Sequence, residues 1–170
     1  MKSLFIGGVK SGKSLQAEQF ALNFCQKNNL MKPIYLATSE FKDKEMQQRI
    51  NNHQQQRQDK FITIEEALYV DKTISQLDSE QVIIIECISI WLNNMLYHQF
   101  SHKQILQQIN TIAELPQHLI FVQNDVGCGI IPDNPLAREY LDLSGKISQL
   151  LGQTCDQVFF CIAGLKQKIK

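Results

Sequence analysis

The sequence lacks most of the features that mark secreted, membrane-spanning or nucleic-acid-binding proteins. Its five cysteines are scattered and form no CxxC pair, which argues against a disulfide framework and against a zinc site. No apolar run approaches the length of a membrane span, and the short one at the start soon meets charges and glycines, unlike a secretory signal. Seventeen basic and seventeen acidic residues balance, so the basic field of a nucleic-acid or membrane-surface binder is missing. We therefore expect a cytoplasmic protein with reduced thiols, no nucleic-acid partner and no membrane span.

Short apolar runs alternate with longer amphipathic stretches along the chain. The runs are continuously apolar, as in parallel strands buried on both faces. Expected strands are 3–6, 33–37, 82–87, 118–123 and 157–163, with a weaker one at 61–64. Expected helices are 13–27, 43–58, 66–77, 89–113 (with a break) and 135–151. This alternation predicts a three-layer α/β fold with a mainly parallel central sheet, in one domain over residues 1–170.

Apolar spacing also predicts the inward faces of two helices. In the first helix, Leu15, Phe20 and Phe24 are expected to turn toward the sheet. In the last helix, apolar residues recur at helical spacing, namely Leu136, Tyr140, Leu143, Ile147 and Leu150. We expect both sets to contribute to the core.

The segment GGVKSGKS follows the first strand and opens the first helix. It matches the P-loop pattern, in which glycines let successive backbone N–H groups point at phosphate oxygens. Lys13 is expected to reach the β- and γ-phosphates, and the Ser14 hydroxyl to bind Mg²⁺. The alternative, a glycine-rich turn that binds nothing, does not account for the order of strand, motif and helix. The predicted nucleotide cradle comprises Gly7, Gly8, Val9, Lys10, Ser11, Gly12, Lys13 and Ser14.

Two further segments are expected at the same edge of the sheet. Glu86 ends the run VIIIE, and ligands of open α/β sheets bind at the carboxyl ends of the strands. It is a candidate Mg²⁺ ligand, although an acid that merely caps the next helix would look the same. The loop 124–135 contains Gly127, Gly129 and Pro132, which favour tight turns or close approach to a ligand; a purely structural loop is equally consistent.

One histidine has two arginines at helical spacing. On the expected helix 43–58, Arg49 and Arg57 lie four residues before and after His53. Neighbouring positive charge lowers a histidine pKa and keeps the imidazole neutral and nucleophilic. From spacing alone, however, a solvated surface histidine is the simpler interpretation.

Several motifs together resemble a known family. They occur in the order GGVKSGKS, YLATSE, EMQQRINNHQQQR, IIIECISIWLNN, NDVGCGIIPDNPLAREYLDLSGKISQ and AGLKQKIK. This sequence is similar to the bifunctional adenosylcobinamide kinase / adenosylcobinamide-phosphate guanylyltransferase family of cobalamin biosynthesis, from Ser3 to Lys170. The P-loop is widespread, whereas the RIxxH and VGxGIxPxNxLAR blocks are specific to this resemblance. A RecA-like P-loop NTPase fold is implied.

The resemblance implies an enzyme with two activities. The hydroxyl of adenosylcobinamide would first take the γ-phosphoryl group of ATP or GTP. A histidine, His53 by its place in RINNH, would then attack the α-phosphorus of GTP, and the cobinamide phosphate would take the GMP to give adenosylcobinamide-GDP. Lys13 and Mg²⁺ would offset the charge on the leaving pyrophosphate. Relatives of this kind form trimers, so a homo-oligomer is expected.

The resemblance also implies nucleotide contacts outside the P-loop. They are Thr38, Ser39, Gln54, Gln55, Gln56, Arg57, Glu65 and Glu86. Two alternatives stay open: a P-loop small-molecule kinase without nucleotidyl transfer, and a non-enzymatic GTP-binding module. The second is disfavoured because the base-reading N/TKxD stretch of GTP switches is missing from the sequence.

Overall fold

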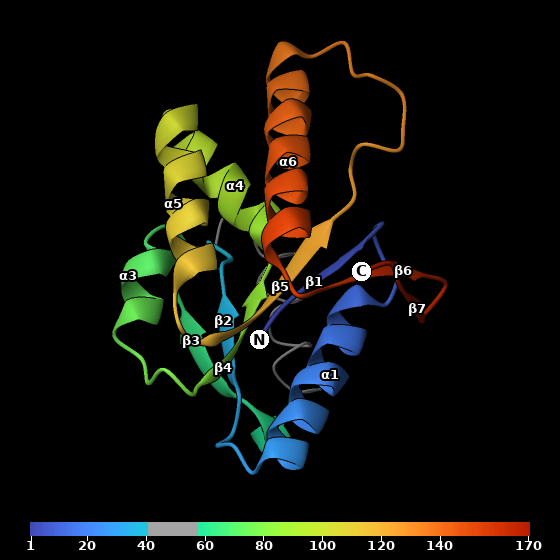
Figure 1. Ribbon diagram of the computed structural model, residues 1–170. Helices are drawn as coiled ribbons and strands as arrows, with labels where there is room; N and C mark the ends of the chain where they lie inside the picture. The colour runs from blue at the N-terminus through green and yellow to red at the C-terminus, as the bar shows by residue number, and fades with distance from the viewer. Residues whose placement is uncertain (41–57) are drawn as a thin grey trace.

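A seven-stranded sheet forms the centre of the computed structural model, which describes residues 1–40 and 58–170. The strand order is β3-β2-β4-β5-β1-β6-β7 (Figure 1). The strands are β1 (Lys2–Gly7), β2 (Ile34–Ala37), β3 (Ile62–Glu65), β4 (Val82–Glu86), β5 (His118–Asn124), β6 (Gln157–Ile162) and β7 (Leu165–Lys168). All neighbouring strands are parallel except β6 and β7. The expected mainly parallel sheet is confirmed.

Helices cover both faces of this sheet. They are α1 (Lys13–Asn28), α3 (Val70–Ser75), α4 (Ile88–Tyr97), α5 (His102–Glu114) and α6 (Pro135–Thr154), with a short 3-10 turn, η1 (Gln58–Lys60). Helix α1 packs on one face, and α3 to α6 pack on the other (Figure 1). Each face has its own apolar cluster, so the buried strands separate two cores. The three-layer α/β architecture is therefore confirmed.

Several helix boundaries differ from those expected, and in one case local backbone and capping residues explain the difference. The stretch 89–113 divides into α4 and α5 because Gln99 has a positive φ of 59° and Ser101 caps the second helix. The Ser101 hydroxyl and the Gln104 side chain form a capping box that fixes the start of α5. The expected helix 66–77 is shorter, and 43–58 lies outside the described residues apart from Gln58. The tail adds β7, which the apolar pattern did not predict.

Burial was predicted wrongly for two residues. Leu15 of α1 is 56% exposed, because the helix faces the sheet with the small residues Ala17, Ala21 and Cys25 at four-residue spacing. Leu136 of α6 is 61% exposed, because the first turn of this helix extends beyond the sheet. Leu143 and Ile147, the next positions of the same stripe, are buried as expected. At the end of the stripe, Leu151 is buried, whereas Leu150 had been expected there.

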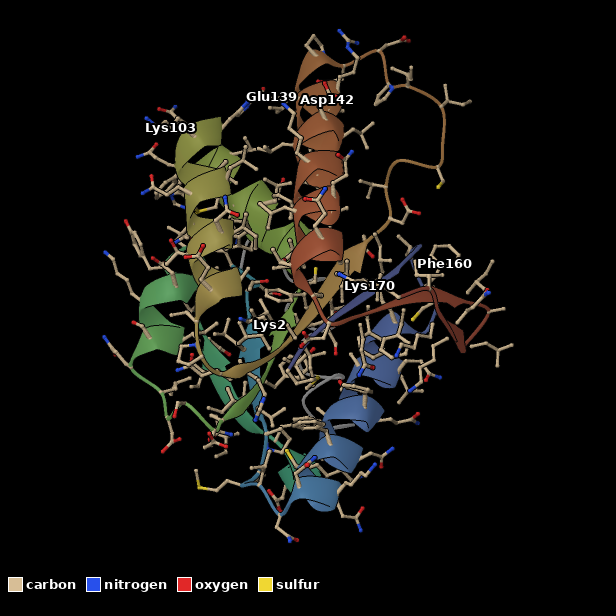
Figure 2. The ribbon with its side chains drawn as sticks, in the orientation of Figure 1. Lys2, Lys103, Glu139, Asp142, Phe160 and Lys170 are labelled. Carbon is tan, nitrogen blue, oxygen red and sulfur yellow. The ribbon has the colours of Figure 1, made fainter. Side chains whose placement is uncertain are left out.

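Charged side chains lie on the outer faces of α5 and α6. Lys103, Glu139 and Asp142 point away from the core (Figure 2). His102 of α5 forms a hydrogen bond with Glu139 of α6 at 2.6 Å, a contact between exposed groups that contributes little to stability. None of the helices in residues 1–40 and 58–170 is long and apolar enough to cross a membrane.

Candidate functional site

The P-loop connects the carboxyl end of β1 to the first turn of α1. Gly7 is the last residue of β1, and the loop then turns sharply, with the Ser11 N–H donating to the Gly8 carbonyl at 3.2 Å. Lys10 and Gly12 have positive φ values of 57° and 91°. These left-handed conformations turn the chain into the amino terminus of α1, where free N–H groups and the helix dipole favour an anion.

Two glycines of the loop are required by close packing. A Cβ on Gly7 would lie 2.3 Å from the Cys161 carbonyl oxygen of β6, far inside contact distance. A Cβ on Gly12 would lie 2.9 Å from the Cα of Gly164. The Ser11 hydroxyl beside Gly7 is buried and makes no hydrogen bond within the part of the chain that the structure describes. The two ends of the loop therefore pack closely against Cys161 and Gly164, while Val9 at its tip is 81% exposed.

The lysine of the P-loop motif, Lys13, bends back over the loop. Lys13 is the first residue of α1 and is only 7% exposed, yet it carries an ammonium group. Its Nζ donates to the Gly8 carbonyl oxygen at 3.2 Å. A buried ammonium held by a neutral carbonyl is poorly compensated, so phosphate oxygens would be favourable partners for it.

Ser14 and Glu86 meet across the sheet edge. The Ser14 hydroxyl donates to Glu86 Oε1 at 2.8 Å, although 72 positions separate the two residues. Hydroxyl and carboxylate oxygens are ligands that Mg²⁺ prefers, and one or two protein ligands suffice when phosphates and water complete the shell. The described residues contain no group of three or more histidine, cysteine, aspartate or glutamate side chains that could hold a metal ion. Glu86 therefore lies where the sequence predicted and is suited to hold Mg²⁺ with Ser14.

The carboxyl ends of neighbouring strands bring the other predicted residues to this edge. Ala37 of β2 is in register with Glu65 of β3 on one side and with Glu86 of β4 on the other. Glu65 is exposed at the end of its strand, and Ser39 follows two residues after β2. Both lie at the predicted edge; whether they contact a nucleotide stays a prediction.

Thr38 has a structural part to play. Its side chain is fully buried, and its hydroxyl donates to the Cys87 carbonyl at 2.9 Å. Its backbone N–H donates to the Glu86 carbonyl at 3.0 Å, and its own carbonyl accepts from Asn94 at 2.7 Å. These bonds fix the segment that follows Glu86. Cys87 is buried too, and this burial raises the pKa of its thiol to about 12, so it is no thiolate nucleophile.

The residues predicted for guanylyl transfer lie outside the described residues. They are His53, Gln54, Gln55, Gln56 and Arg57. The chain reaches them from Glu40, whose carboxylate contacts His98 Nε2 at 2.9 Å. Three other histidines each have a neighbouring partner among the described residues: His98 contacts Glu40, His102 contacts Glu139, and His118 contacts the Met1 amino group.

The turn between β6 and β7 supports the P-loop. This contact was not predicted from the sequence. The Gly164 N–H donates to the Ser11 carbonyl at 3.0 Å, and the Gly164 carbonyl accepts from Gln16 of α1 at 2.8 Å. Ala163 and Gly164 both have positive φ values, typical of a two-residue hairpin turn. The Ala-Gly pair is a local signal of a tight turn, whereas LKQK after it has a single apolar residue and no strand pattern.

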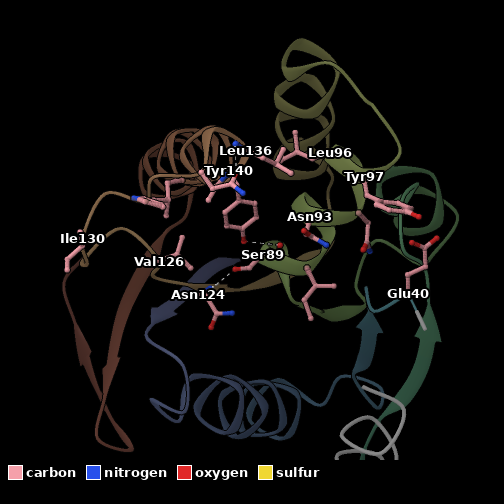
Figure 3. Close-up of a pocket in the computed structure, with 16 residues that line it drawn as sticks. Glu40, Ser89, Asn93, Leu96, Tyr97, Asn124, Val126, Ile130, Leu136 and Tyr140 are labelled. Atoms are coloured by element: carbon pink, nitrogen blue, oxygen red, sulfur yellow. Dashed lines mark hydrogen bonds between the residues drawn. The ribbon is translucent and has the colours of Figure 1, made fainter. Parts of the chain in front are cut away.

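A cavity of about 720 Å³ lies beside the P-loop, between α4, α6 and the loop that follows β5 (Figure 3). Residues of the loop 124–135 contribute to its lining, so the expectation that this loop lies at the active edge is consistent with its position. Asn124, in the lining, is in register with Gly7 of the P-loop.

Comparisons with known proteins agree with this geometry. The bifunctional adenosylcobalamin biosynthesis protein CobP of Pseudomonas aeruginosa is 31% identical, over all of this chain and 98% of its own length. The CobU proteins of Escherichia coli and Salmonella typhimurium are 29% and 30% identical over the whole of both chains. The flagellar accessory protein FlaH of Methanocaldococcus jannaschii has a similar fold, with a TM-score of 0.52 at 12% identity over 99% of this chain and 77% of that protein. The family described as cobinamide kinase / cobinamide phosphate guanyltransferase matches residues 3–169, and this chain belongs to that family.

Proposed function

We propose that this protein phosphorylates adenosylcobinamide with ATP or GTP and then transfers GMP from GTP to the resulting phosphate. The observation that supports this most is the meeting of Lys13, Ser14 and Glu86 at one sheet edge in a chain of the cobinamide kinase family. Of the two half-reactions, the described residues supply the groups for phosphoryl transfer, and the guanylyl step rests on His53.

In the kinase step, the acceptor hydroxyl loses its proton to solvent and its oxygen forms a bond to the γ-phosphorus, while the bond from this phosphorus to the β-phosphate oxygen breaks and releases the nucleoside diphosphate. The P-loop N–H groups and the amino terminus of α1 hold the phosphates, and Lys13 neutralises charge that develops on them. Ser14 and Glu86 would hold Mg²⁺, which screens the phosphate charge when bound.

In the guanylyl step, a nitrogen of His53 forms a bond to the α-phosphorus of GTP, and pyrophosphate leaves. A phosphate oxygen of the cobinamide phosphate then displaces the histidine nitrogen from that phosphorus, which restores the imidazole and yields adenosylcobinamide-GDP. Covalent catalysis of this type replaces one displacement between two large anions by two steps with smaller partners. Ser39, Glu65 and Arg57 are proposed to contact the guanine nucleotide, whereas Thr38, which was also expected to do so, is fully buried and fixes the segment after Glu86 instead.

Labelled GTP tests both the phosphoryl-transfer and the guanylyl-transfer activity. The wild-type protein is incubated with α-labelled and, separately, γ-labelled GTP and Mg²⁺, and is then denatured in mild alkali, which preserves a phosphoramidate. Label from the α-phosphate only, lost in His53→Ala and retained in the control His102→Ala, is the expected result. Phosphorylation of adenosylcobinamide without protein-bound α-label would instead identify a kinase that lacks nucleotidyl transfer. Neither activity would identify a GTP-binding module.

The quaternary structure and compartment belong to the same proposal. By resemblance to the family, the protein is proposed to act as a homotrimer in the cytoplasm. Multi-angle light scattering of the purified protein measures the molar mass, and a monomeric mass at working concentration would refute the trimer.

A further inference from the structure

The cavity beside the P-loop differs chemically from the phosphate cradle. Its apolar wall includes Ile90 and Leu96 of α4, Val126 of the loop, and Leu136 of α6. Figure 3 shows Leu136 and Tyr140 on one side of the cavity and Leu96 on another, with Asn124 at its base. No lysine, arginine or histidine lines it in the ranges 1–40 and 58–170. A triphosphate would therefore find no cation here, whereas a neutral and largely apolar ligand would be accommodated.

The polar groups of the lining suit amides. The side-chain amides of Asn93 and Asn124 make no hydrogen bond within the described residues and are available to a ligand. Glu40, the one acid in the lining, contacts His98 at 2.9 Å. An amide side chain both donates and accepts, so it pairs well with a carboxamide. The lining thus matches a ligand that combines apolar surface with carboxamide groups.

The cavity and the P-loop share their structural supports. The Asn124 N–H donates to the Ser89 hydroxyl at 2.7 Å, and both residues line the cavity. The next backbone N–H, of Asp125, donates to the Gly7 carbonyl at 3.0 Å. Ser89 itself comes three positions after Glu86. A ligand in the cavity is consequently beside the phosphate cradle, on the side of β4 and β5.

The cavity is also held open by its own bonds. The Tyr140 hydroxyl donates to the Ser89 carbonyl at 3.0 Å, and burial raises the pKa of Tyr140 to about 12, so the hydroxyl keeps its proton. The neighbouring Ile130 and Leu136 are 96% and 61% exposed, so their apolar side chains are available to a ligand that extends beyond the cavity. These side chains extend the apolar surface from the cavity to its rim.

We propose that this cavity binds the corrin edge and the hydroxyl-bearing arm of the cobinamide acceptor, and that it directs the hydroxyl toward the γ-phosphate in the P-loop. The inference rests on the proposed function, which supplies the acceptor, and adds the binding site. A cobinamide is an apolar macrocycle edged with carboxamides, which is the combination that the lining fits. The large exposed isoleucine and leucine side chains at the rim would cover the part of the macrocycle that extends beyond the cavity.

A cavity-filling substitution tests the proposal. Ala137 lies in the first turn of α6 and lines the cavity, so Ala137→Trp places an indole within it. Glu139→Trp, on the exposed side of the same helix, is the matched control. Leu136→Ser is a second variant with little risk to folding, because this side chain is largely exposed. Binding is measured by equilibrium dialysis with adenosylcobinamide, which absorbs visible light, and by the KM values for acceptor and nucleotide.

The expected result is that Ala137→Trp raises the Kd and KM for cobinamide about tenfold or more. The nucleotide KM and the α-label taken up from GTP are expected to stay unchanged, since neither needs the acceptor. Leu136→Ser is expected to weaken cobinamide binding in the same selective way, and Glu139→Trp to behave as wild type.

Three results would overturn the proposal. In the first, wild-type transfer is intact and Ala137→Trp and Leu136→Ser both bind cobinamide within twofold of wild type. In the second, Ala137→Trp lowers the molar mass and abolishes guanylylation together with kinase activity, which would make the cavity an interface between copies of the chain. In the third, the wild type binds no cobinamide in dialysis. Loss of the proposed function itself is distinguishable, because wild-type protein would then bind cobinamide yet transfer neither phosphoryl nor guanylyl groups.

Discussion

Gly12 of the P-loop packs against Gly164 of the β6–β7 turn, and alanine substitutions at these two positions are expected to affect activity differently. Both have left-handed backbones, with φ of 91° and 80°. An alanine at either position carries the cost of a non-glycine residue in this region, about 1–2 kcal/mol. For a chain of this length that corresponds to a loss of about 2–6 °C in Tm. The strain is therefore matched in Gly12→Ala and Gly164→Ala.

The steric consequences are not matched. A Cβ on Gly12 would lie 2.9 Å from the Gly164 Cα, whereas a Cβ on Gly164 has no atom within 4 Å. Since carbon atoms pack at about 3.5–4.0 Å, Gly12→Ala must displace the P-loop from the hairpin by roughly 0.5–1 Å. A misplacement of about 1 Å in a phosphate-binding group costs on the order of 10²-fold in rate.

Thermal unfolding and phosphoryl-transfer kinetics separate the two effects. We expect Gly12→Ala to lower Tm at least as much as Gly164→Ala does, and only Gly12→Ala to lose about 10²-fold in kcat/KM for the kinase step. Gly164→Ala is expected to stay within about threefold of wild type, because its Cβ displaces nothing. Equal losses of kcat/KM in the two variants, or full activity in Gly12→Ala, would refute the claim that the hairpin sets the position of the P-loop.

Three further predictions follow from single contacts. Glu86→Gln keeps the acceptor of the Ser14 hydroxyl but removes the negative charge, so we expect the Mg²⁺ concentration for half-maximal activity to rise about tenfold or more; an unchanged Mg²⁺ dependence would contradict the ligand assignment. Burial lowers the pKa of His118 below 6.5, and the Met1 ammonium, which donates to its Nδ1, lowers it further. Because the unfolded chain then binds more protons than the folded one, the stability that this group contributes is full above pH 6.5 and is lost as the pH falls below it. His118→Gln should therefore flatten the dependence of Tm on pH in that range relative to wild type. Asn134→Ala removes the side-chain oxygen that caps α6 and is expected to cost about 1 kcal/mol in chemical denaturation, whereas Asn134→Ser should restore most of it.

The sequence predicts the positions of the P-loop and Glu86 in the fold because the relevant signals are local. The P-loop needs only a strand, two constrained glycines and a helix start within a few residues, and Lys13 and Ser14 then occupy the first helical turn whatever the rest of the chain does. Glu86 was predictable because a continuously apolar run ends on a charge, which marks the carboxyl end of a buried parallel strand.

The features missed depend on contacts between distant segments. Strand β7 is exposed along its whole length, so no apolar pattern identified it, and its pairing with β6 became visible only in the fold. Leu136 continues the apolar stripe of α6, and spacing alone cannot show that the sheet ends before that turn. The support of Ser11 by Gly164 joins residues 153 positions apart, and no sequence pattern encodes such a distance.

The central claim is that GTP guanylylates His53. Its most direct test is tandem mass spectrometry of a proteolytic digest, made under alkaline conditions, after wild-type protein has reacted with GTP and Mg²⁺ without acceptor. We expect one GMP group on the peptide that contains His53, with fragment ions that place it on this residue, and we expect it to disappear when cobinamide phosphate is added. A digest without this adduct, or one that carries GMP only on another residue, would contradict guanylylation of His53.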